Sequence, residues 1–156
     1  MKANELMIGD CVCAVDTIGA SRCIAHILEL KDVPYLACGI WGEIHKYELL
    51  EPIPLTPRIL EGSGFSFGNT ASEEDCEGIY EKGWCYCDEN GEVKVTFPHG
   101  TDGGEIYVNN YSFRTLRLVF PDKIYLHELQ HALKLGGIEK EITLDGIDVN
   151  VNAKNM

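Results

Sequence analysis

The stretch Gly83–Phe97, GWCYCDENGEVKVTF, decides how the second half of this chain folds. Gly83–Cys87 and Val93–Phe97 are rich in aromatic and β-branched residues, which favour strands. The four residues between them, DENG at 88–91, are typical of a tight turn, because Asp and Asn bond nearby backbone groups and Gly accepts a positive φ. The stretch therefore predicts a β-hairpin.

Further strands are predicted on both sides of this hairpin. Residues 65–83 are rich in Gly, Ser and acidic residues, which predicts a long loop with one short strand. After a turn at 101–104, strands at Glu105–Val108 and Arg114–Phe120 continue a β-meander. Alternation over Glu141–Val151 adds an edge strand.

One amphipathic helix over residues 122–135 is predicted to close this meander. Asp122 is the expected N-cap, and Gly136-Gly137 supplies the left-handed residue that commonly ends a helix. On a wheel of about 100° per residue, His127 and His131 lie almost opposite the apolar arc. We therefore expect both histidines to face away from the helix's main packing surface. The arc contains Tyr125, Leu126, Leu129, Ala132 and Leu133.

The first fifty residues predict a small antiparallel barrel of the SH3-like kind, in which closure removes exposed strand edges. Turn-forming residues separate four short apolar runs, which are Cys11–Val15, Ser21–Leu30, Tyr35–Ile40 and Ile44–Leu49. The expected inward residues are Leu6, Ile8, Val12, Ile24 and Leu28.

A Pro-rich connector follows the predicted barrel. Residues 51–55, EPIPL, form neither a helix interior nor a central strand, since Pro lacks the backbone donor and fixes its own φ. Thr56-Pro57 then begins a short helix with Thr as N-cap, and the run GSG at 62–64 stops it near residue 60 or 61. The expected fold is α+β, with a small β-barrel over 1–51, the connector and short helix over 52–64, and the meander with its C-terminal amphipathic helix over 65–156.

The composition is that of a folded protein. A chain of 156 residues is enough for one ordinary domain or two very small ones, and 45% apolar with 24% charged residues is a common globular mixture. No run approaches the roughly 18 apolar residues that cross a membrane. We therefore expect no membrane association.

The net charge of −12 is concentrated in the middle of the chain. Residues 61–92 contain one Lys or Arg against nine Asp and Glu, so they account for −8 of the total. Direct binding to a nucleic-acid backbone is disfavoured, because such binding depends on Lys and Arg neutralising phosphates. The segment is either a solvated acidic loop or an acidic face offered to a basic partner.

Seven cysteines and the absence of an export signal predict a cytoplasmic protein with reduced thiols. Two C-x-C pairs, Cys11/Cys13 and Cys85/Cys87, raise the question of a zinc site. Residues two apart on a strand share a face, and the usual structural zinc spacing has two to four residues between the first two ligands. Buried apolar packing is the favoured interpretation of these thiols.

The motif HELQH at 127–131 is the H-E-x-x-H signature of zinc hydrolases. On a helix, His127 and His131 would bind one Zn²⁺ while Glu128 acts as general base on the metal-bound water. Catalytic zinc needs a third protein ligand, and no His follows His131. The upstream candidates are His26, His45 and His99. We expect no cofactor, with zinc held by His127 and His131 as the alternative.

Three blocks of the chain resemble a widespread group of uncharacterised small proteins carried by prophages and mobile elements of gut bacteria. The blocks are NELMIGD at 4–10, EPIPLT at 51–56 and YLHELQ at 125–130. They are similar to the group's patterns E-L-x-I-G-N/D, E-P-I-P-L-T and Y-V-H-x-L-Q-N. The family-like residues of the last block are Tyr125, His127, Leu129 and Gln130, whereas Glu128 and His131 fall at positions that are variable or commonly Asn. The resemblance thus implies no zinc chemistry.

These observations favour a non-enzymatic phage or mobile-element accessory protein that binds a partner, which we expect to be a protein with a basic surface, in the cytoplasm of a bacterial host. A zinc-dependent hydrolase using His127, Glu128 and His131 is one alternative. A sponge for a small signalling nucleotide is another.

Overall fold

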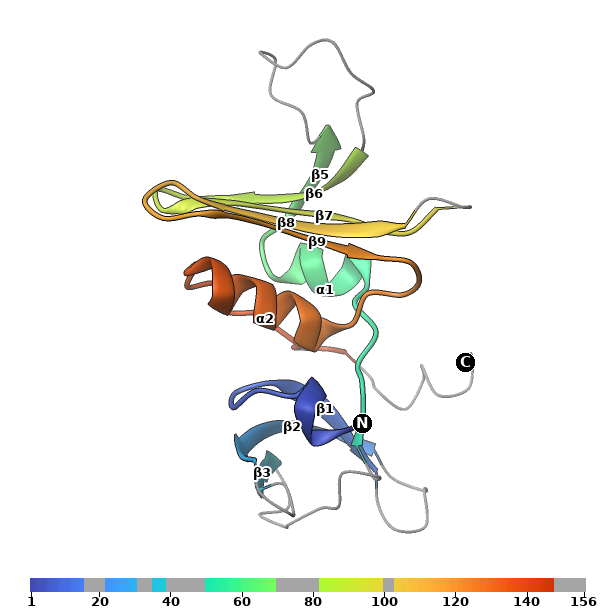
Figure 1. Ribbon diagram of the computed structural model, residues 1–156. Helices are drawn as coiled ribbons and strands as arrows, with labels where there is room; N and C mark the ends of the chain where they lie inside the picture. The colour runs from blue at the N-terminus through green and yellow to red at the C-terminus, as the bar shows by residue number, and fades with distance from the viewer. Residues whose placement is uncertain (16–21, 31–34, 39–49, 70–81, 100–102, 148–156) are drawn as a thin grey trace. The chain divides into compact units, whose positions relative to one another are not determined.

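The computed structural model describes residues 1–15, 22–30, 35–38, 50–69, 82–99 and 103–147 (Figure 1). The chain divides into two compact units. One contains Met1–Pro54, Tyr125–His127 and Gly146–Met156, and the other contains Leu55–Ile124 and Glu128–Asp145. The fold is mixed α and β with antiparallel sheets, as the sequence predicts at that level.

The larger unit is built on a five-stranded antiparallel sheet in the order β5-β6-β7-β8-β9. The predicted hairpin at 83–97 is confirmed as β6 (Lys82–Cys87) and β7 (Gly91–Thr96), with Trp84 opposite Val95. The other strands are β5 (Ser66–Asn69), β8 (Gly104–Asn110) and β9 (Thr115–Phe120). The predicted meander is therefore present.

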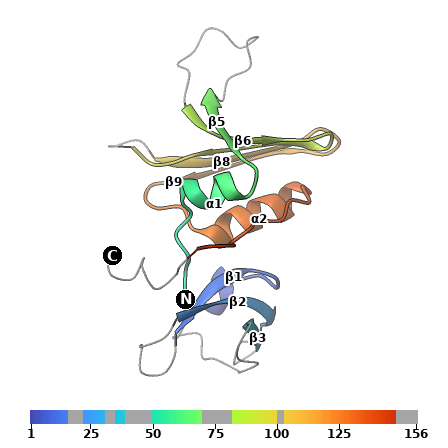
Figure 2. The ribbon, with the colours of Figure 1, turned by 180° about the vertical axis from the view of Figure 1, so that it is seen from behind.

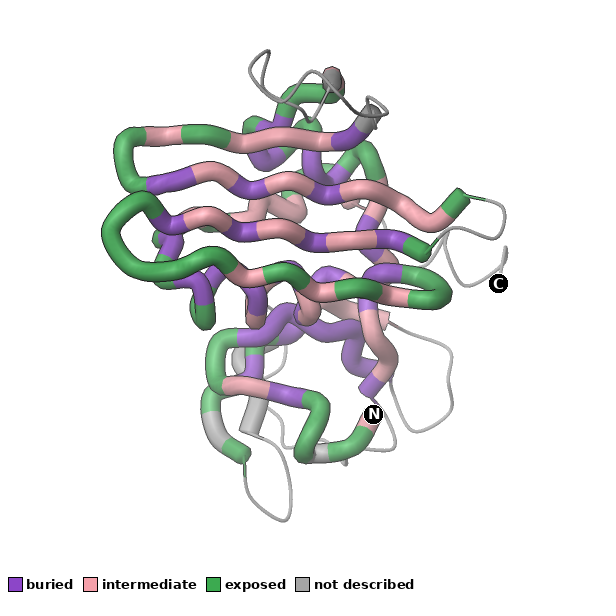
Figure 3. The backbone as a smooth tube through the Cα atoms, turned by 45° about the horizontal axis from the view of Figure 1, so that its top comes forward, coloured by how far each residue is buried: buried purple, intermediate pink, exposed green. Residues whose placement is uncertain are grey.

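One face of this sheet is covered by helices α1 (Pro57–Gly62) and α2 (Leu126–Gly136), as Figures 1 and 2 show from opposite sides. Alternate residues of β7 and β8 are buried on that face, which is the expected period of two (Figure 3). The buried strand residues are Val93, Val95, Ile106 and Val108, and the buried helix residues include Ile59, Leu60, Leu129 and Leu133.

Helix α1 begins and ends where the sequence predicts. The Thr56 Oγ1 accepts a hydrogen bond from the Ile59 N–H at 3.3 Å, so Thr56 is the N-cap. After the helix, the Ser63 hydroxyl donates to the Ile59 carbonyl at 2.7 Å and accepts from the Thr143 N–H at 2.9 Å. Ser63 thus ties the segment after α2 to the end of α1.

Helix α2 begins four residues later than predicted, so the assignment of Asp122 as N-cap is wrong. The Leu55 N–H donates to the Ile124 carbonyl at 2.9 Å, and the Leu126 N–H donates to the Ile53 carbonyl at 2.8 Å. The residues before α2 are therefore held by strand-like pairing with the Pro-rich connector, which is extended as predicted.

The end of α2 confirms the sequence prediction. Gly137 has a φ of +70°, and its N–H donates to the Lys134 carbonyl at 3.2 Å. The Ile138 N–H donates to the Leu133 carbonyl at 2.9 Å, which completes a Schellman motif. The side chains of Leu133 and Ile138 are both buried. The predicted edge strand at 141–151 is not formed over 141–147, and 148–151 lie outside the described residues.

The smaller unit contains a second antiparallel sheet in the order β3-β2-β1-β4. It begins with a 3₁₀ turn, η1 (Ala3–Glu5). Its strands are β1 (Cys11–Val15), β2 (Arg22–Glu29), β3 (Tyr35–Cys38) and β4 (Leu50–Glu51). Its core comprises Leu6, Val12, Ala14, Ala25, Ile27 and Leu50.

The described strands of this sheet do not form the closed barrel that the sequence predicts, because β3 and β4 are its two edges and do not pair with each other. The predicted run at 44–49 lies outside the described residues, as do 16–21, 31–34 and 39–43. The SH3-like connection of these strands therefore stays a prediction.

Two of the five expected inward residues, Leu6 and Val12, are buried, and three are not. Ile8 is 57% exposed, Leu28 is 42% exposed and Ile24 is only partly buried. In the pairing of β1 with β2, Val12 lies opposite Ala25, and Ala25 and Ile27 are buried in the core. The face of β2 that lies in the core is therefore not the predicted one, which carries Ile24 and Leu28. Apolar residues occupy both faces of β2, and its hydrophobic pattern therefore leaves the buried face undecided.

No helix within the described part of the chain has the length and apolar character that crossing a membrane requires.

Candidate functional site

Helix α2 carries the three residues of the zinc hypothesis, which are His127, Glu128 and His131. His127 is buried, with 7% of its surface exposed, whereas Glu128 and His131 are partly buried. The His127 ring stacks on that of Tyr125, with the centroids 6.1 Å apart and the planes 17° apart. The prediction that both histidines face away from the main packing surface of the helix stays a prediction, since Tyr125–His127 belong to the smaller unit and Glu128–Asp145 to the larger one.

The proposed third ligands are not brought into a metal site in the described residues. His26 is exposed on β2, with its Nδ1 3.2 Å from the Cys11 Sγ, and His99 is exposed after β7. His45 lies outside the described residues. Within the described ranges, no group of three or more His, Cys, Asp or Glu side chains is arranged to hold a metal ion. The zinc alternative therefore stays a hypothesis.

The two C-x-C pairs lie on different sheets. Cys11 and Cys13 are buried in β1, where all five residues are buried, as expected for thiols that serve as small apolar side chains. Cys85 and Cys87 lie on β6, where Cys85 is partly buried and Cys87 is exposed. Burial raises the pKa of the Cys85 thiol.

The face of the five-stranded sheet opposite α1 and α2 carries charged and polar side chains in balance. The Lys94 ammonium lies 3.8 Å from the Glu92 carboxylate and 5.5 Å from the centre of the Tyr107 ring. Across the neighbouring pair of strands, the Arg117 guanidinium lies 2.6 Å from the Glu105 carboxylate. This balance gives the face no strong preference for either an anionic or a cationic partner.

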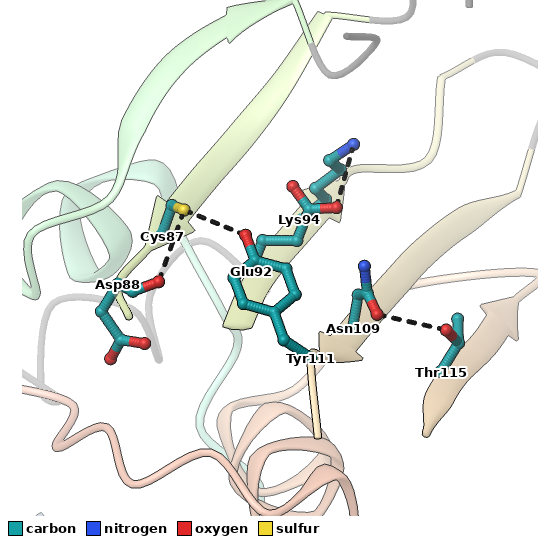
Figure 4. A network of polar contacts seen from close by, with 7 residues as sticks. All are labelled: Cys87, Asp88, Glu92, Lys94, Asn109, Tyr111 and Thr115. Atoms are coloured by element: carbon teal, nitrogen blue, oxygen red, sulfur yellow. Dashed lines mark hydrogen bonds and ion pairs between the residues drawn. The ribbon is translucent and has the colours of Figure 1, made fainter. Parts of the chain in front are cut away.

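Two turns meet at one end of the sheet. They are the β6–β7 turn with its flanking residues, Asp88–Glu92, and the β8–β9 turn with its flanking residues, Asn110–Arg114. The Tyr111 N–H donates to the Asn90 carbonyl at 3.0 Å. The Tyr111 hydroxyl lies 3.4 Å from the Cys87 Sγ, as Figure 4 shows. We call these two segments, 88–92 and 110–114, the paired hairpin tips.

Asp88 fixes the first of the paired hairpin tips. Its Oδ1 accepts hydrogen bonds from the Asn90 N–H at 2.8 Å and the Gly91 N–H at 3.1 Å, and its Oδ2 accepts from the Tyr86 hydroxyl at 2.9 Å. The bond from the Asn90 N–H, followed by that from Tyr86, lowers the pKa of Asp88 below its usual range. The carboxylate is therefore charged at neutral pH and bound within its own turn.

Asn110 fixes the second of the paired hairpin tips. Its Nδ2 donates to the Gly136 and Gly137 carbonyls at 3.0 and 3.1 Å, and its Oδ1 accepts from the Ser112 N–H at 2.9 Å. Tyr111 and Phe113, on either side of Ser112, are 56% and 80% exposed. The tip therefore holds two aromatic side chains in solvent on an ordered backbone.

Sequence reasoning missed this site, although its local signal was present. The run NNYSFR at 109–114 places two aromatic residues in a turn between predicted strands, where buried packing is not expected. Its pairing with the 88–91 turn is a tertiary relationship that no local pattern contains.

Comparisons of the chain with known family models, with curated proteins and with solved structures found no significant match.

Proposed function

We propose that this protein is a non-enzymatic accessory protein of a phage or mobile element, that it acts in the cytoplasm of a bacterial host by binding another protein, and that it does so through the paired hairpin tips. The origin rests on the resemblance of the 4–10, 51–56 and 125–130 blocks to proteins of mobile elements.

The observation that carries the binding proposal is the hydrogen bond from the Tyr111 N–H to the Asn90 carbonyl at 3.0 Å. It joins two turns that are each fixed by their own side-chain bonds, so the exposed Tyr111 and Phe113 rings sit on a preorganised backbone. Aromatic residues are the usual anchors of protein interfaces, and little conformational entropy is lost when such a surface binds.

The charge of the paired hairpin tips favours a partner with basic side chains. Asp88, Glu89 and Glu92 lie in the first tip, against Arg114 alone in the second. The wider segment 61–92 carries −8, although its residues 70–81 lie outside the described part of the chain. Such a field accelerates association with a cationic surface at low salt.

The experiment compares partner capture by three immobilised forms of the full-length protein, which are the wild type, Phe113→Ser and Leu135→Ser. Leu135 on α2 is 48% exposed, so its substitution removes a comparable exposed apolar side chain from another element. We expect one host protein to be retained by the wild type and by Leu135→Ser, and to be lost with Phe113→Ser.

The affinity of the purified protein for the purified host protein is then measured as a function of salt concentration. We expect the affinity to fall as salt rises and to fall further in Glu89→Lys, since both changes weaken attraction to a basic surface. Equal affinities for the wild type and Phe113→Ser, together with no salt dependence, would remove the paired hairpin tips from the proposal. A shift of the melting temperature by one member of a panel of signalling nucleotides would support the nucleotide-sponge alternative instead.

The zinc-hydrolase alternative is favoured by one observation, which is that His127 and His131 lie one turn apart in a continuous helix. It needs a ligand beyond these two, and His45 is the one upstream His whose position the described residues do not include. Metal content decides between the two functions.

A further inference from the structure

The two edges of the five-stranded sheet differ in character. The β5 edge is four residues long and contains Gly68, whereas the β9 edge is six residues long and apolar. On the helix-covered face of β9, Leu116, Leu118 and Phe120 are only partly buried, although their partners on β8 are fully buried. Val119, on the other face, is 66% exposed. The apolar face of the sheet therefore continues to β9, along which partly buried and exposed residues alternate (Figure 3).

The β9 edge also has few of the features that prevent strand addition. Natural edge strands are usually short, highly charged, bulged or covered. The register of β9 against β8 is regular over all six of its residues, and Arg117 is the one charged residue within it. Within the described residues β8 is the one neighbour of β9 in the sheet. The edge is therefore a template for a further antiparallel strand.

Hydrogen bonding at the β8–β9 turn fixes which backbone groups face that edge. The Asn110 N–H donates to the Arg114 carbonyl at 2.9 Å, so Arg114 is in a hydrogen-bonded pair with β8. Such pairs alternate along antiparallel strands. Thr115 and Val119 therefore direct their N–H and C=O groups away from β8.

We propose that β9 of one copy pairs antiparallel with β9 of a second copy about a two-fold axis at Leu118, which makes a symmetric dimer with a continuous ten-stranded sheet. This inference goes beyond the proposed function, because it is carried by β9 (Thr115–Phe120), and Arg114 is the one residue that it shares with the paired hairpin tips.

The sequence of β9 selects this register over its neighbours. An axis at Leu118 places Leu116 opposite Phe120 and Arg117 opposite Val119, so the apolar row continues across the axis. An axis at Arg117 would instead place two guanidinium groups directly opposite each other, which is destabilising. If the axis lay between two adjacent residues, each side chain on the helix-covered face of one copy would be paired with a residue whose side chain belongs to the opposite face of the other copy.

Charges flanking β9 are complementary in the same register. Arg114 of one copy lies at the level of Asp122 of the other, and the two-fold axis makes this pairing twice. Both residues are exposed and carry opposite charges. A second copy of this chain therefore fits the edge better than a strand of arbitrary sequence.

The test measures the dimer dissociation constant of the full-length protein by sedimentation equilibrium for the wild type, Val119→Lys and Val119→Glu. Residue 119 lies opposite Arg117 in the proposed register, so a Lys there repels and a Glu attracts. Because each substitution occurs twice in the dimer, we expect the dissociation constant to rise about twofold to thirtyfold with Lys and to fall by a similar factor with Glu.

A charge exchange checks the register separately. Asp122→Arg alone is expected to weaken the dimer, and the combination of Arg114→Asp with Asp122→Arg is expected to restore it. Circular dichroism establishes that each variant is folded, and Val119 and Asp122 are exposed enough for substitution to leave the core intact. A wild type that stays monomeric at every concentration, or a dimer whose constant is equal in Val119→Lys and Val119→Glu, would overturn the proposal.

Discussion

The side-chain amide of Asn110, at the end of β8, donates a hydrogen bond to the carbonyl oxygen of Gly136, at the end of α2, over 3.0 Å. The same amide also donates to the Gly137 carbonyl at 3.1 Å. The last carbonyl groups of a helix lack partners within it, so one buried side chain here satisfies the carbonyl of Gly136 and that of the residue after the helix. Asn110 thus couples the five-stranded sheet, the C-terminus of α2 and the second of the paired hairpin tips.

Asn110→Ala is expected to lower the free energy of unfolding by about 1 to 3 kcal/mol, because it removes the buried hydrogen bond to the Gly136 carbonyl. Urea unfolding measures the change. Asn109→Ala is the matched control, since the Asn109 side chain accepts an exposed bond from the Thr115 hydroxyl at 3.3 Å, and we expect a change within about 0.5 kcal/mol. Equal losses in the two variants would show that Asn110 does not cap α2.

Gly137→Ala is expected to destabilise the protein by about 1 to 2 kcal/mol, because Gly137 has a φ of +70° and a Cβ there is strained. The Cβ would also lie 3.1 Å from the Asn110 amide nitrogen. Gly62, the last residue of α1, has open space around it and serves as the control. Gly62→Ala is expected to be neutral or stabilising by up to about 1 kcal/mol in the same thermal and urea unfolding experiments. A destabilisation by Gly62→Ala as large as that by Gly137→Ala would contradict this assignment.

The parts of the fold that the sequence predicts are those determined by neighbouring residues. The 88–91 turn is specified by the Asp88 carboxylate bonding to the N–H groups of Asn90 and Gly91, and the α1 start by Thr56 bonding to Ile59. Each of these bonds joins residues at most three positions apart. Residue type alone therefore carries the information.

The parts that the sequence does not predict depend on distant partners. The start of α2 is delayed by backbone bonds from Ile53 and Leu55, far earlier in the chain. The core-facing row of β2 is set by pairing with β1, since its own pattern is apolar on both faces. The paired hairpin tips depend on Tyr111 meeting Asn90. Sequence periodicity contains none of these three relationships.

The contact between Tyr111 and Cys87 predicts an unusual alkaline titration. The hydrogen bond with the Cys87 thiol raises the pKa of Tyr111 to about 12. Because this value lies above the ordinary value near 10, the protonated hydroxyl stabilises the fold fully below about pH 10, and that contribution is lost as the pH rises towards about 12. The phenolate absorbance of the wild type minus that of Tyr111→Phe isolates this group.

Cys87→Ala is expected to move the Tyr111 titration down towards the ordinary tyrosine pKa. Tyr86 provides an internal comparison, because its own pKa is raised first by the hydrogen bond to Asp88, and the charge of Cys87 is the smallest of the causes that raise it. We therefore expect Asp88→Asn to shift the Tyr86 titration and to leave most of the Tyr111 shift in place. A Tyr111 titration that is unchanged in Cys87→Ala would show that the thiol does not hold the hydroxyl.

Metal content tests whether the HELQH motif on α2 is a site. Since the described residues bring no third ligand to His127 and His131, we expect clearly substoichiometric zinc after purification in zinc-replete medium. His131→Asn is expected to change neither the zinc content nor the melting temperature in added zinc. The partly buried His131 makes this variant a safer test than one at the buried His127. One equivalent of zinc in the wild type, lost in both His131→Asn and His45→Ala, would instead establish a zinc centre with His45 as the third ligand.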